Sequence, residues 1–146
     1  MAGMIDNPSK EVAEAIVAFL RARAASMGIP EDQIRERLDM SGQPKELAGI
    51  TVAVEDRGDH PGCVGRILVD VQPSITCWSH LNDDADGSLC ANMAGSVMAA
   101  MQEVDYHLPD WRVAFPGVWS QTAPTSTEQF RAITLNATLP LVRGSN

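Results

Sequence analysis

The sequence predicts an α+β domain in which two main helices pack on one face of an antiparallel-rich, four-stranded sheet. Apolar residues recur at helical spacing in two separate segments, and they alternate with polar residues at strand spacing elsewhere. The resulting order is helix, hairpin, helix, hairpin, which is typical of helices gathered on one face of an antiparallel sheet. With 146 residues, 45% of them hydrophobic, we expect a single domain over 1–146, with a loose arm at 1–6 and a C-terminal tail at 142–146.

The first helix is predicted to begin after Asn7 and to end at Gly28. Asn7 suits a helix cap, and Pro8 suits the first helical position. Gly28 provides the backbone freedom that helix C-termini commonly use. A shorter helix is predicted from Pro30, and residues 41–49 are predicted to form a loop. The apolar residues that carry these two helical patterns are Val12, Ile16, Val17, Phe19, Leu20 and Ala24 in the first, and Ile34 and Leu38 in the second.

The first hairpin is predicted from two alternating segments. Ile50–Glu55 alternates as a half-buried strand does, and Arg66–Ser79 forms a second, longer strand. The connection Asp56–Gly65 is rich in Gly, Asp and Pro, which favour turns. Pro73 interrupts the second strand, and because proline cannot donate a ladder hydrogen bond, we expect a bulge or a sheet edge there.

The second main helix follows an acidic turn at residues 82–88. Two further strands are predicted at about 111–121 and 129–142. The turn Asn82–Gly87 imitates the first half of a calcium-binding loop, but residue 93, where that loop needs a Glu, is Met. We therefore interpret the acids as stabilising a helix N-terminus, with one of them capping it. The helix itself is predicted from an apolar face comprising Leu89, Met93, Val97, Met101 and Val104.

The charge balance excludes some classes of partner. A net charge of -8, from 11 Lys and Arg against 19 Asp and Glu, argues against a nucleic-acid-binding surface, which needs clustered basic side chains. An acidic surface would let DNA pass without binding it. We see no secretory signal at the start and no apolar run of the roughly 20 residues that a membrane helix needs. We expect no membrane association, and we expect the three cysteines to be free thiols.

HPGC and CWSH carry a possible zinc pattern: His60, Cys63, Cys77 and His80. A structural zinc site needs four such ligands in a tetrahedron. If strand alternation continues to the end of CWSH, Cys77 and His80 point to opposite faces. We therefore favour a buried strand cysteine and a polar histidine at a strand end. A zinc-stabilised binding module stays open as an alternative function.

Enzymatic motifs are missing from the sequence. It holds no G-x-S-x-G, no P-loop and no G-x-G-x-x-G, and Ser79 next to His80 is adjacency rather than a triad. The histidines His60, His80 and His107 have no motif around them. We therefore expect no catalytic residues, no cofactor and no metal. A weaker third interpretation is a small-molecule enzyme that uses the acidic run as a divalent-metal site.

The order of elements resembles the tail-terminator, or tail-completion, proteins of tailed phages and contractile injection systems. The resemblance lies in an N-terminal amphipathic helix such as Glu11–Met27 and a strand such as Ile50–Glu55, followed by a long strand, RILVDVQPSITCWSH. An Asp-rich turn then leads into a helix, DADGSLCANMAGSVMAAMQE, and the chain ends in strands within EQFRAITLNATLPLVR. The resemblance covers nearly the whole chain but rests on the pattern of elements, not on a specific motif. The stretch 30–49 is longer than a minimal member of the family needs.

The resemblance implies a homo-oligomeric ring, usually of six subunits, that caps the tail tube and joins it to the head connector. It implies a virion protein assembled in the host cytoplasm, with tail-tube and neck proteins as partners and DNA passing through the lumen. Another neck or tail-tip protein is an alternative within the same class. Contacts are expected in the loops Asp56–Gly65 and Gly117–Glu128, with the N-terminal arm (residues 1–6) and the tail Val142–Asn146 as further candidates. The candidate interface residues are Asp59, His60, Trp119, Gln121, Thr125 and Arg143.

Overall fold

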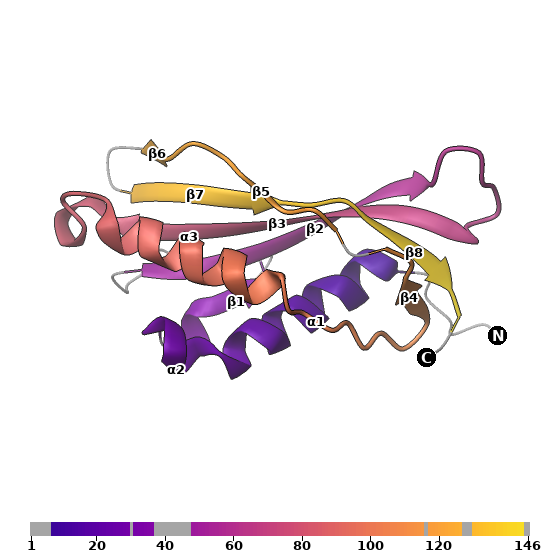
Figure 1. Ribbon diagram of the computed structural model, residues 1–146, viewed down its shortest axis with the longest axis horizontal. Coiled ribbons are helices and arrows are strands. Elements are labelled where there is room, and N and C mark those ends of the chain that lie inside the picture. The colour runs from indigo at the N-terminus through magenta and orange to yellow at the C-terminus, as the bar shows by residue number, and fades with distance from the viewer. Residues whose placement is uncertain (1–6, 30, 37–47, 116, 127–129, 145–146) are drawn as a thin grey trace.

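The computed structural model describes residues 7–29, 31–36, 48–115, 117–126 and 130–144. Among these residues, eight strands form one mixed sheet, and the helices lie on one of its faces (Figure 1). The α+β class and the two main helices are present. The four-stranded sheet is wrong, because the β-structure is divided among eight strands, one of which pairs in parallel.

The first predicted helix is confirmed. Helix α1 (Pro8–Ala22) begins where the Asn7 side chain accepts a hydrogen bond from the Lys10 N–H at 3.1 Å. A one-residue interruption separates it from α2 (Ala24–Met27), which ends at Gly28 in the left-handed conformation, at φ 72°. The face that α1 turns to the sheet is buried, with Val12, Ile16 and Leu20 completely so.

The second, shorter helix predicted from the sequence is not formed. Its described part consists of the 3-10 turn η1 (Glu31–Gln33) and strand β1 (Ile34–Glu36), which pairs in parallel with the next strand, Ile34 beside Ile50. Ile34 is fully buried in the core between sheet and helices. Burial of a β-branched side chain in the sheet outweighs a weak helical pattern. Leu38, the other residue of that pattern, lies outside the described residues.

The predicted first hairpin is confirmed, and its strands are longer than expected. Strand β2 (Ala48–Asp59) pairs antiparallel with β3 (Leu68–His80), with Ile50 opposite Cys77. The register shifts once, near the turn. β3 lies in the middle of the sheet, with β2 on one side and β7 and β8 on the other.

Pro73 is accommodated in this central strand because the pairing of β3 with β7 and β8 is interrupted beside it. On the β2 side pairing continues through Pro73, so the expected bulge is not at this residue. On the other side, β3 pairs with β8 as far as Val71 and with β7 from Ser74 onward. The Pro73 carbonyl accepts from Ala137 N across that gap at 3.3 Å. Because a residue's N and O point to the same side of a strand, the missing N–H of Pro73 faces the interruption.

The C-terminal half departs most from the prediction. Instead of two long strands, the chain uses two short strands in succession to pair with the long β3, and it adds three shorter strands beside them. The predicted C-terminal tail is also shorter, since its first two residues belong to the last strand. These strands are β4 (Trp111–Val113), β5 (Ser120–Gln121), β6 (Thr125–Ser126), β7 (Phe130–Asn136) and β8 (Leu139–Arg143).

The core fills the space between the sheet and the helices α1 and α3 (Ser88–Met101). It requires a glycine at one close approach: a Cβ at Gly49 would lie 2.5 Å from Trp78 Cζ2 on the neighbouring strand. None of the described helices is long and apolar enough to cross a bilayer.

Candidate interaction surfaces

The last residue of β2 and the turn that leads to β3, residues 59–67, lie at one end of the sheet (Figure 1), and we call them the hairpin tip. His60 N donates to Leu68 O at 2.8 Å, and Cys63 N donates to His60 O at 2.9 Å. The His60 ring also lies against β3, with its Nδ1 at 2.8 Å from Asp70 Oδ1. The tip is therefore held to the sheet by several hydrogen bonds.

Arg66 organises the second half of the hairpin tip. Its backbone is left-handed, with φ 56°, and its N–H donates to Asp59 Oδ1 at 3.0 Å. Its guanidinium lies 2.8 Å from Asp56 Oδ2. Burial alone would raise the pKa of Asp56, but hydrogen bonds from Arg66 and from Gly58 N hold that pKa below its ordinary value. Two carboxylates on β2 thus fix the conformation of Arg66.

The hairpin tip exposes apolar side chains. Val64 is 79% exposed and Ile67 is 63% exposed. A folded chain gains nothing from leaving large apolar groups in water, and adjacent exposed apolar groups on a protrusion are typical of an interaction site. Phe115 and Val118 are also strongly exposed, in the segment between β4 and β5.

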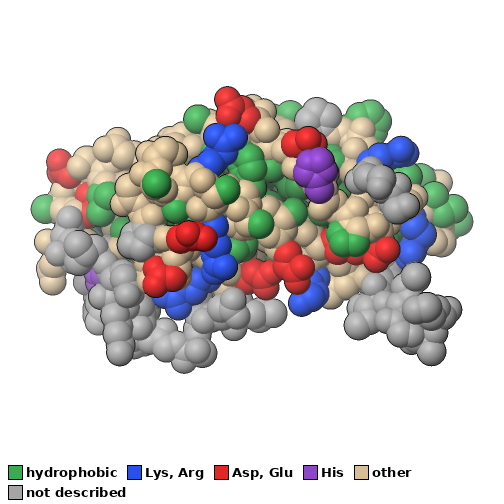
Figure 2. Space-filling model, turned by 90° about the horizontal axis from the view of Figure 1, so that it is seen from below, with side chains coloured by type: hydrophobic (Ala, Val, Ile, Leu, Met, Phe, Trp, Pro, Cys, Tyr) green, Lys and Arg blue, Asp and Glu red, His purple; other side chains and the backbone are tan. Residues whose placement is uncertain are grey.

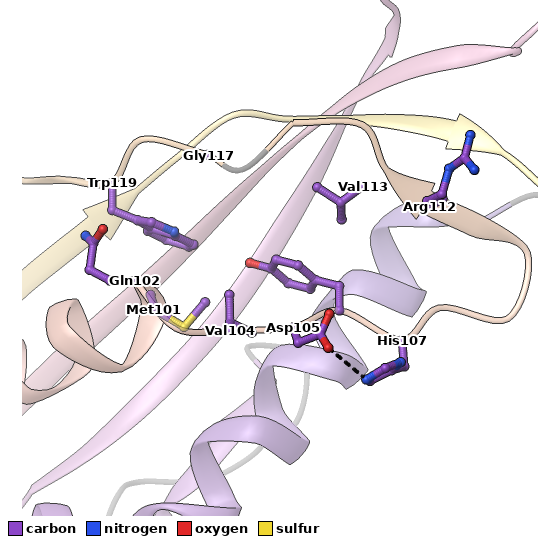
Figure 3. Close-up of a pocket in the computed structure, with 10 residues that line it drawn as sticks. Met101, Gln102, Val104, Asp105, His107, Arg112, Val113, Gly117 and Trp119 are labelled. Carbon is purple, nitrogen blue, oxygen red and sulfur yellow. Dashed lines mark ion pairs between the residues drawn. The ribbon is translucent and has the colours of Figure 1, made fainter. Parts of the chain in front are cut away.

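A second surface is a concave one of about 470 Å³, between the C-terminal end of α3 and the segment 102–119 (Figure 3). We call it the cleft. The side chains of Trp119, Val104 and Val113 point toward its middle. Arg112 stands at one end. The cleft therefore combines an apolar interior with a polar margin.

The margin of the cleft carries titratable and polar groups. His107 Nε2 lies 3.3 Å from Asp105 Oδ2, and both side chains are more than four-fifths exposed. The Tyr106 hydroxyl is buried, and among the described residues it has no hydrogen-bond partner. Burial raises the pKa of Tyr106 well above its ordinary value, so the phenol stays a hydrogen-bond donor.

The structure places the candidate interface residues in several different positions. Asp59 and His60 belong to the hairpin tip, whereas Gln121 and Thr125 lie exposed on β5 and β6, beside β7. Trp119 is only 8% exposed and forms a wall of the cleft. Arg143, the sixth candidate, lies on β8. Its guanidinium carbon is 4.9 Å from the ring centre of the buried Trp111.

The two halves of the zinc pattern are not brought together. His60 and Cys63 lie in the hairpin tip, whereas Cys77 and His80 lie at the far end of β3. Strands rise about 3.3 Å per residue, so these pairs are separated by tens of ångströms. In the part of the chain that the structure describes, no three His, Cys, Asp or Glu side chains are grouped to hold a metal. The geometry therefore does not support the zinc-stabilised module.

The acidic turn before α3 caps the helix, as predicted. The buried carboxylate of Asp84 accepts from Leu89 N and Cys90 N, both at 2.9 Å, and from the Ser79 hydroxyl at 2.8 Å. Burial alone would raise its pKa, but these hydrogen bonds and the nearby Arg131 guanidinium hold the pKa of Asp84 below its ordinary value. Arg131 also donates to the backbone carbonyls of this turn. The turn is thus a structural cap.

The helix face shows mixed charges. Acidic and basic side chains lie next to one another on this face, with hydrophobic side chains between them (Figure 2). The ion pairs of the described residues include Lys10 with Glu14 at 3.1 Å and Arg23 with Glu103 at 3.5 Å. Exposed pairs of this kind contribute little to stability. On the face in view, the acidic side chains of the described residues are interspersed with basic ones.

The cleft was not predicted from the sequence. Its residues come from a helix end, an irregular connection and a short strand, and no periodic pattern links them. Trp119 was named from the sequence as a candidate interface residue, but nothing in the sequence indicated that it lines a cleft with Tyr106.

These features define an α+β domain whose described residues include a hairpin tip with exposed apolar side chains and a cleft. No protein-family model and no curated protein matches the sequence. The fold is shared with solved structures, one of them a chain of the "virion of native gene transfer agent (GTA) particle", with a TM-score of 0.65 at 18% sequence identity over 93% of this chain and 96% of that chain. A second solved structure has a TM-score of 0.60 at 11% identity, over 90% of this chain and 94% of that chain. At these identities the likeness shows a common fold.

Proposed function

We propose that this chain is a structural protein of a phage-like virion. The observation that carries the proposal is the fold shared with a chain of the gene transfer agent virion over nearly the full length of both. The order of elements, which resembles that of tail-terminator proteins, supports the same class. The proposed role is assembly with other virion proteins rather than catalysis.

Within this class, the proposed role is a closed ring of six copies that terminates the tail tube and joins it to the head connector. The whole chain, 1–146, would form one subunit of this ring. A closed ring needs head-to-tail contacts between two different surfaces of each subunit. The hairpin tip and the cleft are two such surfaces, one projecting and one concave. Gln121 and Thr125, exposed on β5 and β6 at the sheet edge beside β7, are proposed contacts for the tube or the connector.

The acidic composition supports the proposed passage of DNA through the ring. A lumen lined with negative charge repels the phosphate backbone, so DNA would move through without specific binding. The net charge of -8 is of the sign that this role requires.

Native mass spectrometry of the purified protein tests the ring. The expected result is a closed oligomer of defined mass, six copies without metal, with smaller species on dilution. Gold-labelled antibodies against the protein on intact particles then test the position. Label at the junction of head and tail supports the tail terminator, and label at the distal tail tip would instead support a tail-tip protein. A protein missing from purified particles would overturn the virion role.

A further inference from the structure

The hairpin tip and the cleft match each other in apolar character. The tip presents Val64 and Ile67 with most of their surface in water. The cleft presents Trp119 and Val113 on its inner walls. Contact between these groups would remove apolar surface of both from water, which is the main favourable term in protein association.

Their charged groups also match. Asp59 at the base of the hairpin tip is exposed. Arg112 at the end of the cleft is exposed, and the described part of the chain gives it no ion-pair partner. Opposite charges beside a common apolar contact favour one orientation of the two surfaces.

We propose that the hairpin tip of one copy inserts into the cleft of the next copy, with Val64 and Ile67 against Trp119 and Asp59 beside Arg112. This inference rests on the proposed ring, and it names the contact that closes it. Because the tip and the cleft are different surfaces, each copy offers one of each. The contact is then head-to-tail, as a ring requires.

A disulfide test detects the contact even when it is short-lived. Cys63 is a partly exposed thiol in the hairpin tip, whereas Cys77 and Cys90 are buried and do not compete for oxidant. The variant Val113→Cys places a second thiol in the cleft. Equal amounts of isotopically heavy and light protein are oxidised, and the linked peptides are identified by mass spectrometry. The expected product joins Cys63 of one copy to position 113 of another.

The matched control is Thr125→Cys, which places an exposed thiol on β6. A rate of linkage at position 113 well above the rate at position 125 supports the contact. Equal rates, or links between Cys63 residues only, would overturn it.

Two single variants then test the head-to-tail geometry in solution. Val64→Asp damages only the hairpin tip, and Arg112→Glu damages only the cleft, where it places like charge beside Asp59. Each variant alone should remain monomeric where the wild-type protein assembles. Mixed one to one, they retain one intact contact per pair, so the expected species is a heterodimer that grows no further. The control Leu89→Asp lies in the first turn of α3, at the opposite end of the molecule, and should assemble as the wild type does (Figure 1).

The outcomes separate this contact from the ring itself. If the wild-type protein forms a closed oligomer and both variants do too, the ring stands and the contact is refuted. If the wild-type protein stays monomeric and position 113 does not link to Cys63, both the ring and the contact fail.

Discussion

The buried carboxylate of Asp84 joins the end of β3 to the start of α3, and its removal should destabilise the fold. Asp84 is 3% exposed and accepts hydrogen bonds from three donors: Ser79 Oγ, Leu89 N and Cys90 N. In the variant Asp84→Ala all three donors lose their acceptor. Two of these donors are backbone N–H groups in the first turn of α3, and N–H groups at that position have no carbonyl acceptor within the helix.

The expected loss in the free energy of unfolding is about 3 kcal/mol. Removal of a helix cap costs about 0.5–2 kcal/mol. A buried donor left without a partner costs about 1–3 kcal/mol, and the costs are not fully additive because the turn can relax toward water. For a domain of this size, a loss of about 3 kcal/mol lowers Tm by roughly 6–12 °C. The matched control is Asp86→Ala, since Asp86 is exposed and its side chain accepts from Ser88 N. This variant should lose much less free energy of unfolding than Asp84→Ala.

Urea unfolding followed by tryptophan fluorescence measures both variants against the wild type. The pH dependence gives a second reading. Because the folded protein holds the pKa of Asp84 below its ordinary value near 3.8, the carboxylate stabilises the fold at neutral pH, and this contribution disappears as the pH falls below that value toward the folded-state pKa. The gap between wild type and Asp84→Ala should therefore narrow in acid. Equal losses for Asp84→Ala and Asp86→Ala, or a gap independent of pH, would refute the capping role.

Two further predictions follow from close packing and burial. Gly49→Ala should lower the free energy of unfolding by about 1–3 kcal/mol, because its Cβ would press on the Trp78 ring and on a backbone carbonyl. At Gly95 an added Cβ would meet nothing within 4 Å beyond its chain neighbours and the backbone of its own helix, so an equal cost for Gly95→Ala in a urea titration would contradict this reasoning. A thiol reagent should modify Cys63 quickly in the folded protein. Cys77 should react only on unfolding, because burial shields its thiol and raises its pKa to about 12. Rapid modification of more than one thiol per chain would count against the burial of Cys77 and Cys90.

The elements that local signals define were predicted correctly. Asn7 with Pro8, and Gly28, mark the two ends of the first helical segment, and the structure has both. The alternation in Ile50–Glu55 identified β2, because one face of that strand is buried and the other is not. These signals succeed because the chemistry of caps and of half-buried strands is contained in a few neighbouring residues.

The number of strands could not be predicted, since strand boundaries in the C-terminal half depend on distant partners. The break between β7 and β8 falls opposite Pro73, more than sixty residues earlier in the sequence. Ile34 appeared helical because its pattern covered too few residues to show that it lies beside Ile50 in the sheet. The cleft depends on the way the chain returns after α3, so its residues share no pattern in the sequence.

The hairpin tip is attached to β3 by hydrogen bonds, so its proposed contact with another copy can be tested separately from the stability of the fold. His60 is fixed by Leu68 O and by Asp70, so the tip is ordered by hydrogen bonds to the sheet rather than by burial of its apolar residues. A tip that is already ordered avoids part of the entropy cost of binding, about 0.5–1.5 kcal/mol for each side chain that would otherwise be immobilised. Val64 contributes little to the folded monomer, because 79% of its surface is in water. Val64→Asp should therefore weaken assembly while leaving the urea midpoint of the monomer within error of the wild type, and a lower midpoint would show that the tip is part of the fold's own stability.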